Sequence, residues 1–261
     1  MSRIKQAFEN AKAEGRAALV GYLTAFDPDL EGSRERIMAA CDAGLDVLEL
    51  GVPFSDPTAD GGDVQAAMIR ALAAGATLPG VLDLARSIRE RTDIPIVLFS
   101  YANPLLQMGS RLGATAANAG IDGLLVVDCP PAHAEELRGP AAARGLDWIG
   151  LVAPTTTPAR MEAVASVSTG FVYAVTLKGV TGAEVDVDSD ALTEQLASVQ
   201  ARFDVPVAAG FGVRSAKQAQ VLARKADGVV VGSALIRAAQ ESVGALTELV
   251  RDLRAGTEVD K

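Results

Sequence analysis

Short runs of apolar, often β-branched residues alternate with longer amphipathic stretches along the whole chain. The short runs are apolar at consecutive positions, which is typical of strands buried on both faces of a parallel sheet. They predict strands at 18–24, 46–50, 96–101, 123–128, 148–152, 171–176, 205–209 and 228–231. The longer stretches predict helices at 33–43, 78–90, 109–119, 158–167, 191–202 and 215–226, several of which begin at a Ser or Asp cap or an early Pro. The amphipathic N-terminal segment predicts one extra helix before the first strand.

Eight strand–helix repeats in 261 residues match a closed (β/α)8 barrel, the TIM barrel, better than an open doubly wound sheet. Length alone, at about 150 residues per domain, would suit either two small domains or one large one. No linker rich in Pro, Ser or Gly, no low-complexity tract and no shift in composition divides the chain. The sequence therefore predicts a single α/β domain, a TIM barrel over residues 1–261.

The spacing of the predicted strands is uneven. About 50 residues separate the starts of the second and third strands and about 34 those of the sixth and seventh, against 23–28 elsewhere. The segments after strands 2 and 6 are therefore predicted to contain long loops. In a barrel both loops lie at the C-terminal ends of the strands, where active sites are built, so they are candidate lids.

Composition removes several kinds of chemistry. The chain has one histidine, His133, so zinc triads, two-His iron sites and His-based nucleophile triads are excluded, and no metal site is predicted. His133 itself lies at a predicted helix start and is expected to be exposed and non-catalytic. With 33 acidic against 24 basic residues, the net charge is −9 and no Lys/Arg cluster is present, which argues against binding to nucleic acid or an anionic membrane.

The N-terminus has no apolar signal region, and no apolar run approaches the 18 or so residues of a membrane span. These features predict a cytoplasmic protein. Two cysteines, Cys41 and Cys129, are expected to be unpaired and reduced, as suits that compartment, and Cys41 is expected to be buried.

Two carboxylates are candidates for acid/base chemistry. Glu49 lies near the C-terminal end of an otherwise apolar predicted strand, where burial raises the pKa of a carboxyl group and where barrels present catalytic groups. Asp60 follows on the long loop, as does Asp56, which is interpreted as a turn or contact residue rather than a catalyst. The alternatives are a salt-bridged strand end for Glu49 and a turn before Gly61-Gly62 for Asp60.

Glycine-rich turns follow the last three predicted strands, at 179–182, 210–212 and 232–234. Glycines let backbone N–H groups approach an anion, and a helix beginning at Ser233 would direct its positive end toward that anion. Barrels commonly bind phosphate after strands 7 and 8. A single Gly-X-Gly can be only a tight turn, but two at consecutive strand ends with a Ser predict a phosphate site.

Two further residues carry open alternatives. Tyr173 alternates with Phe171 and Val175 on the sixth strand, so it points either toward a ligand or into plain core packing. Lys178, near the end of that strand, could form a Schiff base if an apolar pocket lowered its pKa, but a solvated side chain in a Gly-rich loop is the competing interpretation.

The segment 48–61, LELGVPFSDPTADG, carries both carboxylates in one continuous motif. APTTTP at 153–158, GVTGA at 179–183, GFG at 210–212 and GSA at 232–234 follow in order. On these residues the chain resembles the tryptophan synthase alpha chain family, essentially from end to end. The long motif is highly specific, and the short glycine motifs are supporting evidence.

The resemblance implies a (β/α)8 barrel that cleaves indole-3-glycerol phosphate to indole and glyceraldehyde 3-phosphate by a retro-aldol step. It implies no metal and no organic cofactor in this chain. It also implies a partner, the tryptophan synthase beta chain, which holds pyridoxal phosphate and receives the indole within an α2β2 heterotetramer.

The resemblance also implies residue roles. Glu49 would protonate the indole ring carbon and help to remove the side-chain hydroxyl proton, and Asp60 would stabilise positive charge at the indole nitrogen. Thr181 would hold the loop after strand 6 over the loop that carries Asp60, and Asp56 would face the partner. The phosphate would be held by Gly182, Gly212, Gly232 and Ser233, and the indole pocket would be bordered by Tyr22, Tyr173 and Phe211.

The chain departs from the family pattern without losing a catalytic group. Phe26 occupies a position where the family usually has Gly, and Thr58 one where it usually has an aliphatic residue. Gly62 and Asp63 occupy positions where Pro and an apolar residue are common, and Leu177 and Lys178 occupy positions often held by Arg and Ser. Two alternative functions remain open at this point: a Schiff-base aldolase that uses Lys178, and a weakly active barrel that mainly activates a beta subunit.

Overall fold

The computed structural model describes residues 2–176, 189–210 and 212–259, and its strands form one parallel sheet in the order β5-β4-β3-β2-β1-β9-β8-β7-β6. The strands are β1 (Ala18–Thr24), β2 (Val47–Gly51), β3 (Ile96–Ser100), β4 (Gly123–Val126), β5 (Asp147–Trp148), β6 (Gly150–Val152), β7 (Val172–Val175), β8 (Val207–Gly210) and β9 (Gly228–Val231). Only Ile149 separates β5 from β6, so the two ends of the sheet are halves of one strand. The ring therefore closes as a barrel of eight strands, which confirms the predicted TIM barrel.

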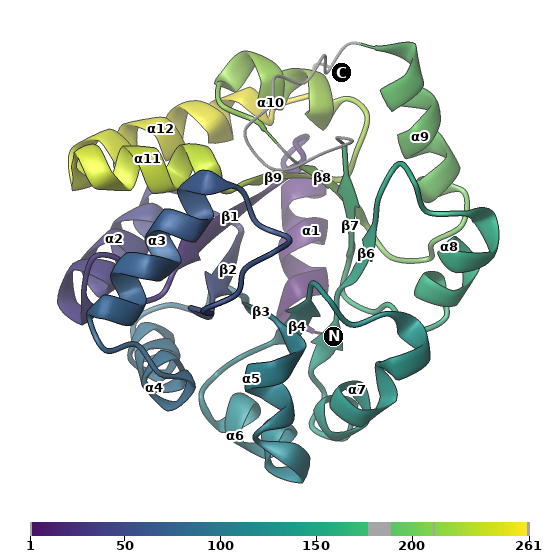
Figure 1. Ribbon diagram of the computed structural model, residues 1–261. Coiled ribbons are helices and arrows are strands. Elements are labelled where there is room, and N and C mark those ends of the chain that lie inside the picture. The colour runs from purple at the N-terminus through teal and green to yellow at the C-terminus, as the bar shows by residue number, and fades with distance from the viewer. Residues whose placement is uncertain (1, 177–188, 211, 260–261) are drawn as a thin grey trace.

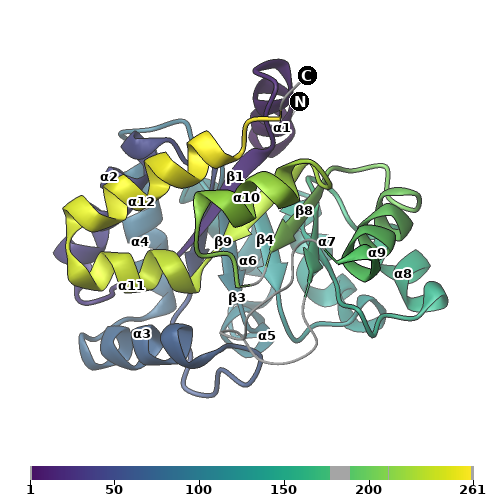
Figure 2. The same ribbon diagram turned by 90° about the horizontal axis from the view of Figure 1, so that it is seen from above.

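Helices surround the ring of strands, except α1, which lies at one end of it (Figures 1 and 2). They are α1 (Arg3–Ala13), α2 (Leu30–Ala43), α3 (Gly62–Ala73), α4 (Leu78–Arg89), α5 (Ala102–Leu106), α6 (Leu112–Asn118), α7 (Glu135–Ala142), α8 (Pro158–Ala165), α9 (Asp190–Gln200), α10 (Ala216–Ala223), α11 (Ser233–Glu241) and α12 (Val243–Gly256), with short 3-10 turns at Gly109–Arg111 and Pro131–His133. The runs of apolar residues that predicted the strands are buried, because the outer face of each strand packs on these helices and the inner face fills the barrel.

The predicted extra N-terminal helix is present as α1, and it closes one end of the barrel. It lies at the centre of the ring in Figure 1 and beyond one end of the strands in Figure 2. Ile4, Phe8 and Ala11 on its buried face join the apolar cluster inside the barrel. The Phe8 ring lies 5.4 Å from the ring of Phe171, centroid to centroid. The N-terminal ends of the strands are thus covered by apolar packing.

The additional residues between the second and third strands form helix α3, which the pattern of apolar positions did not predict. The loop occupies only positions 52–61, and α3 begins directly after it. The predicted long loop after the sixth barrel strand, β7, includes residues 177–188, which lie outside the described residues. The helix predicted at 33–43 begins earlier, at Leu30, because the Asp29 side chain caps it by accepting a hydrogen bond from Gly32 N at 2.8 Å.

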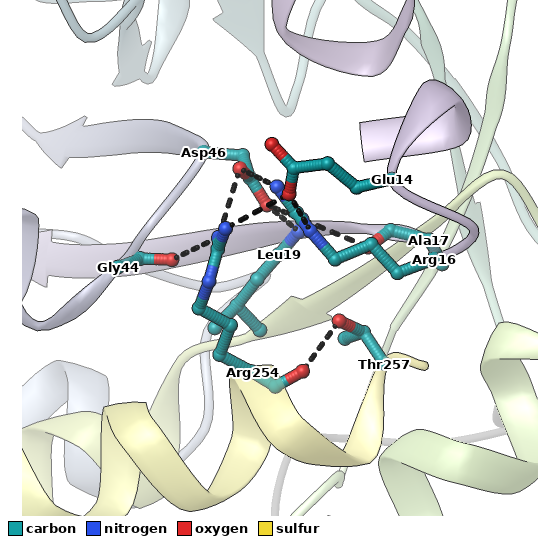
Figure 3. A network of polar contacts seen from close by, with 8 residues as sticks. All are labelled: Glu14, Arg16, Ala17, Leu19, Gly44, Asp46, Arg254 and Thr257. Atoms are coloured by element: carbon teal, nitrogen blue, oxygen red, sulfur yellow. Dashed lines mark hydrogen bonds and ion pairs between the residues drawn. The ribbon is translucent and has the colours of Figure 1, made fainter. Parts of the chain in front are cut away.

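An ion-pair network joins distant segments at the N-terminal ends of the strands (Figure 3). It consists of Glu14, Arg16, Asp46 and Arg254, and we call it the Arg16 network. Arg16 donates to both oxygens of Asp46, at 2.5 and 2.8 Å. Arg254 of α12 donates to Asp46 at 3.2 Å and to Glu14 at 3.1 Å. The network connects the segment before β1, the start of β2 and the last helix.

No single helix of the described residues is long and apolar enough to cross a membrane. Helices α3 and α4 reach that length and hydropathy only when taken together, and the chain bends by 100° between them.

Candidate active site

A cavity of about 190 Å³ opens at the C-terminal ends of the barrel strands, the end opposite to α1. Both candidate carboxylates, Glu49 and Asp60, contribute to its wall. Apolar and aromatic side chains make up most of the rest, including Tyr22, Val64, Phe99, Val127, Leu151, Tyr173, Val175, Val213 and Val230. A largely apolar cavity with a few polar groups is what a small-molecule site requires.

Among the described residues, Glu49 is a buried carboxyl group without a charged partner. It lies on β2, opposite Tyr22 of β1 and Val97 of β3, and is 1% exposed. Its Oε1 atom is buried and has no hydrogen-bond partner in the part of the chain that the structure describes. Burial raises the pKa of this carboxyl group to about 8, so it holds its proton at neutral pH. No described residue forms the salt bridge that the alternative interpretation of Glu49 required.

Asp60 is also buried, at 6% exposed, where the loop after β2 leads into α3. The Tyr101 hydroxyl donates a hydrogen bond to its Oδ2 atom at 2.6 Å, and Ala59 N donates to the same hydroxyl at 2.9 Å. Burial raises the pKa of the Asp60 carboxyl group, and the hydrogen bond from Tyr101 partly opposes this. Asp60 is thus held in a fixed orientation in the cavity wall, not displayed in an exposed turn.

Aromatic rings border the two carboxyl groups. Tyr22 packs edge-on against Phe99, with ring centroids 5.0 Å apart, and Phe54 stacks on Tyr101 at 4.8 Å. Tyr173 lines the cavity, which agrees with the predicted orientation toward a ligand. Its side chain also packs against the apolar cluster inside the barrel. Burial raises the pKa of the Tyr22 and Tyr173 phenols well above the usual value, so both stay neutral.

The predicted phosphate residues that the structure describes meet at the same cavity. Gly212, Gly232 and Ser233 all line it. Gly212 has φ of +78°, a left-handed conformation that favours glycine. Ser233 is the first residue of α11, as predicted, so the N-terminus of that helix lies at the cavity wall. Thr181, Gly182 and Phe211, and with them Lys178, lie outside the described residues.

Three residues of the site were not singled out from the sequence. Tyr101 donates the hydrogen bond to Asp60, and its position at the end of the third predicted strand could have indicated it. Arg214 and Arg237 line the cavity. Arg237 pairs with Asp63 across a sequence separation of 174 residues, and no local pattern reveals such a contact.

Other expectations are confirmed or corrected by the structure. His133 is exposed, and Ser55 and Asp56 are exposed on the loop after β2. Cys41 is half-buried, not fully buried as expected, although it packs against the outer apolar cluster. Phe26 has φ of +65°, which explains why glycine is usual at this position. No three His, Cys, Asp or Glu side chains of the described residues gather as metal ligands would.

The comparison with known proteins decides the family. A sequence model described as "Tryptophan synthase alpha chain" matches residues 8–259. The chain belongs to the tryptophan synthase alpha chain family. Members of this family cleave indole-3-glycerol phosphate, and the pyridoxal phosphate of tryptophan synthase belongs to the beta subunit, so the alpha chain needs no cofactor of its own.

Individual relatives agree with this family. The tryptophan synthase alpha chain of Gluconacetobacter diazotrophicus is 49% identical over 94% of this chain and 90% of its own length. That of Citrifermentans bemidjiense is 46% identical over 97% of this chain and 94% of its own. A chain from a crystal structure of Mycobacterium tuberculosis tryptophan synthase superposes with a TM-score of 0.93 at 38% identity, covering 99% of both chains. An aminoacrylate-bound form of that enzyme gives a TM-score of 0.90 at 37% identity, covering 98% of this chain and 100% of the other.

Proposed function

We propose that Glu49 and Asp60 carry out the retro-aldol cleavage of indole-3-glycerol phosphate in this chain. The observation that carries the proposal is the placement of two buried carboxyl groups in the wall of one cavity, with Gly212, Gly232 and Ser233 in the same wall. An indole ring and a phosphate group need this combination of apolar surface, acid/base groups and anion-binding backbone.

Glu49 supplies the proton transfers of the reaction. Its raised pKa keeps it protonated at neutral pH, so it can donate a proton to the indole ring carbon that bears the side chain. The resulting carboxylate then accepts the proton of the adjacent side-chain hydroxyl as the carbon–carbon bond breaks and the aldehyde forms. One proton enters and one leaves, so Glu49 returns to its starting state.

Asp60 stabilises the charge that this step creates. Protonation of the ring carbon places positive charge on the indole nitrogen, and a fixed carboxylate in a dry cavity stabilises that charge strongly. The hydrogen bond from Tyr101 favours the ionised form of Asp60 and fixes its orientation. Asp60 is therefore the electrostatic partner and Glu49 the proton carrier.

The remaining roles concern substrate binding. Backbone N–H groups at Gly212, Gly232 and Ser233 hold the phosphate at the N-terminus of α11, while Tyr22 and Tyr173 border the indole ring. Sequence alone supports the roles of three further residues, Thr181 in closing the loop after β7, Gly182 in phosphate binding and Phe211 beside the indole.

The test compares Glu49→Gln and Asp60→Asn with the unchanged chain in a steady-state assay of indole release from indole-3-glycerol phosphate. We expect each variant to lose at least about a hundredfold in kcat, because general acid–base catalysis typically contributes 10²–10⁴. Glu31→Gln is the matched control, since that side chain is exposed in the first turn of α2. Activity of Glu49→Gln equal to that of the control would contradict the proposal.

We further propose that the chain pairs with a tryptophan synthase beta chain as α2β2. The exposed loop around Asp56 lies beside the cavity, where a partner could receive indole. Sedimentation of an equimolar mixture with a beta chain should give one species of two copies each, and the mixture should cleave the substrate faster than the isolated chain. Separate sedimentation of the two chains would contradict this.

We also propose that the chain is a single domain over residues 1–261 and that it is located in the cytoplasm. The free thiols of Cys41 and Cys129 suit a cytoplasmic location.

A further inference from the structure

An ion pair crosses the wall of the cavity next to the candidate phosphate site. Arg237 lies one helical turn after Ser233 in α11, so the two side chains share a helix face, and both line the cavity. The Arg237 Nη1 atom contacts the Oδ2 atom of Asp63, which is in the first turn of α3, three residues after Asp60. The pair therefore connects the helix of the phosphate site with the helix that follows the Asp60 loop.

The ion pair between Arg237 and Asp63 is placed so that it can open and let Arg237 bind another anion. The side chains of Arg237 and Asp63 are 41% and 33% exposed, so water reaches both. Ion pairs of this kind contribute only about 0–1 kcal/mol, and little is lost when one opens. A phosphate group at Ser233 would offer arginine a doubly charged, two-oxygen acceptor, which binds a guanidinium more strongly than a single carboxylate contact does. Asp63 would then remain favourably placed in the first turn of α3, near the positive end of that helix.

We propose that Arg237 is a phosphate-positioning residue, which pairs with Asp63 in the free chain and transfers to the phosphate group of the bound substrate. The inference rests on the proposed function, because it assigns the phosphate of that substrate to the N-terminus of α11. It adds a side-chain cation to a subsite otherwise made of backbone N–H groups. It also gives Asp63 a role, since this carboxylate competes with the phosphate for Arg237.

The test measures the dissociation constant of glycerol 3-phosphate by calorimetry, and kcat and KM for indole-3-glycerol phosphate, in four proteins. These are the unchanged chain, Arg237→Gln, Asp63→Asn and the double variant. We expect Arg237→Gln to weaken glycerol 3-phosphate binding and to raise KM about tenfold with kcat changed less than twofold. Asp63→Asn should strengthen binding about threefold because Arg237 loses its competing partner. The double variant should bind as weakly as Arg237→Gln alone.

The signs and the double variant separate this proposal from simpler roles. If the pair only holds α3 and α11 together, both single substitutions will weaken binding, which would overturn the proposal. If Asp63 only repels phosphate through space, its gain will persist in the double variant, which would also overturn it. Arg86→Gln and Asp83→Asn, which change charge in an exposed pair on α4, should leave both constants unchanged.

The glycerol 3-phosphate titration needs no turnover, so it judges Arg237 even if the chain does not cleave indole-3-glycerol phosphate. Arg237→Lys provides a second check, because it keeps the charge but loses the two-pronged geometry. It should recover part of the affinity lost in Arg237→Gln. Binding by the lysine variant that is as weak as binding by the glutamine variant would contradict a direct charge contact.

Discussion

Glu49 shows how one residue can be costly for the fold and useful for the chemistry. A strand interior would be more stable with an apolar side chain here, because a buried carboxyl group without a partner loses its hydration. The neutral form survives this burial, and the pKa rises to about 8 as a result. The same environment that penalises the carboxylate keeps a proton available at neutral pH.

The raised pKa predicts a pH-dependent stability. Unfolded Glu49 ionises near its ordinary value of 4.5, whereas folded Glu49 holds its proton up to about 8. The folded state therefore binds the extra proton between these values, and the free energy of unfolding falls as pH rises through this window. Glu49→Gln removes this penalty. We expect urea unfolding to show the variant more stable by ~1 kcal/mol at pH 5.5 and by ~4 kcal/mol at pH 7.5. A difference that does not grow with pH would contradict the burial argument.

Tyr101 fixes Asp60, and its removal should be visible in two measurements. Tyr101→Phe deletes the donor to Asp60 Oδ2 and the acceptor of Ala59 N, so the free energy of unfolding should fall by about 1–3 kcal/mol. The pKa of Asp60 should rise, since this hydrogen bond lowers it, and the acidic limb of the kcat profile should move to higher pH. Tyr173→Phe is the comparison, because that hydroxyl makes no hydrogen bond to Asp60 within the described residues. Equal shifts in both variants would contradict the assignment.

At the scale of single residues, the sequence predicts those whose role follows from their position along a strand or a helix. Glu49 follows from a carboxyl group at the end of an apolar strand, and Ser233 from its place at a helix start. The contacts of Asp60 and Arg237 do not follow, because Tyr101 and Asp63 reach them from distant segments of the chain. Pairing across a cavity depends on the whole fold, and no local period encodes it.

Elements were predicted best where burial is complete on both faces. All eight barrel strands were placed to within a few residues, since a short, uninterrupted apolar run between two amphipathic stretches is typical of a strand inside a parallel sheet. Helix α3 was missed because the Pro and Gly residues before it indicate a loop, and it begins at Gly62 with no side-chain cap. Helix α12 was also missed.

From the position of α1 we expect that a substitution in this helix lowers the stability of the protein without lowering its activity. Phe8 is 4% exposed and contacts Phe171 inside the barrel, so Phe8→Ala should lower the free energy of unfolding by about 3–5 kcal/mol. Because α1 lies at the end opposite to the cavity, kcat/KM should change less than threefold at a temperature where the variant is folded. Ile69→Ala is the control, since Ile69 is 67% exposed and should cost less than about 0.5 kcal/mol. A large loss of kcat in the folded Phe8 variant would contradict this separation.

The whole molecule has two ends with different tasks. Hydrogen-bonded strand pairing runs around the ring, and the Arg16 network joins its beginning to its last helix at the N-terminal ends of the strands. The cavity occupies the other end, where the strand ends and the following loops meet. Barrels of this architecture generally keep stability at the N-terminal end and chemistry at the C-terminal end.

The Arg16 network is expected to stabilise the closed ring. Arg16 and Asp46 have side chains only 6% and 11% exposed. Asp46→Asn leaves the buried guanidinium with only the more exposed carboxylate of Glu14, 2.7 Å from Arg16 Nε, as counter-charge. We expect a loss of about 1–3 kcal/mol in the free energy of unfolding, measured by urea titration, with kcat unchanged in the folded protein. Asp83→Asn breaks an exposed pair and should cost less than about 1 kcal/mol. Equal losses in the two variants would show that the Arg16 network adds nothing beyond a surface pair.

Because α1 closes one end of the barrel, it also determines where small molecules enter and leave the cavity. Ile4, Phe8 and Ala11 fill the N-terminal end with apolar packing, so in the part of the chain that the structure describes a ligand reaches Glu49 from the rim of the C-terminal end. Arrival and departure then share one route. A compound that covered the rim without touching the carboxyl groups would slow the entry of substrate and the exit of both products together.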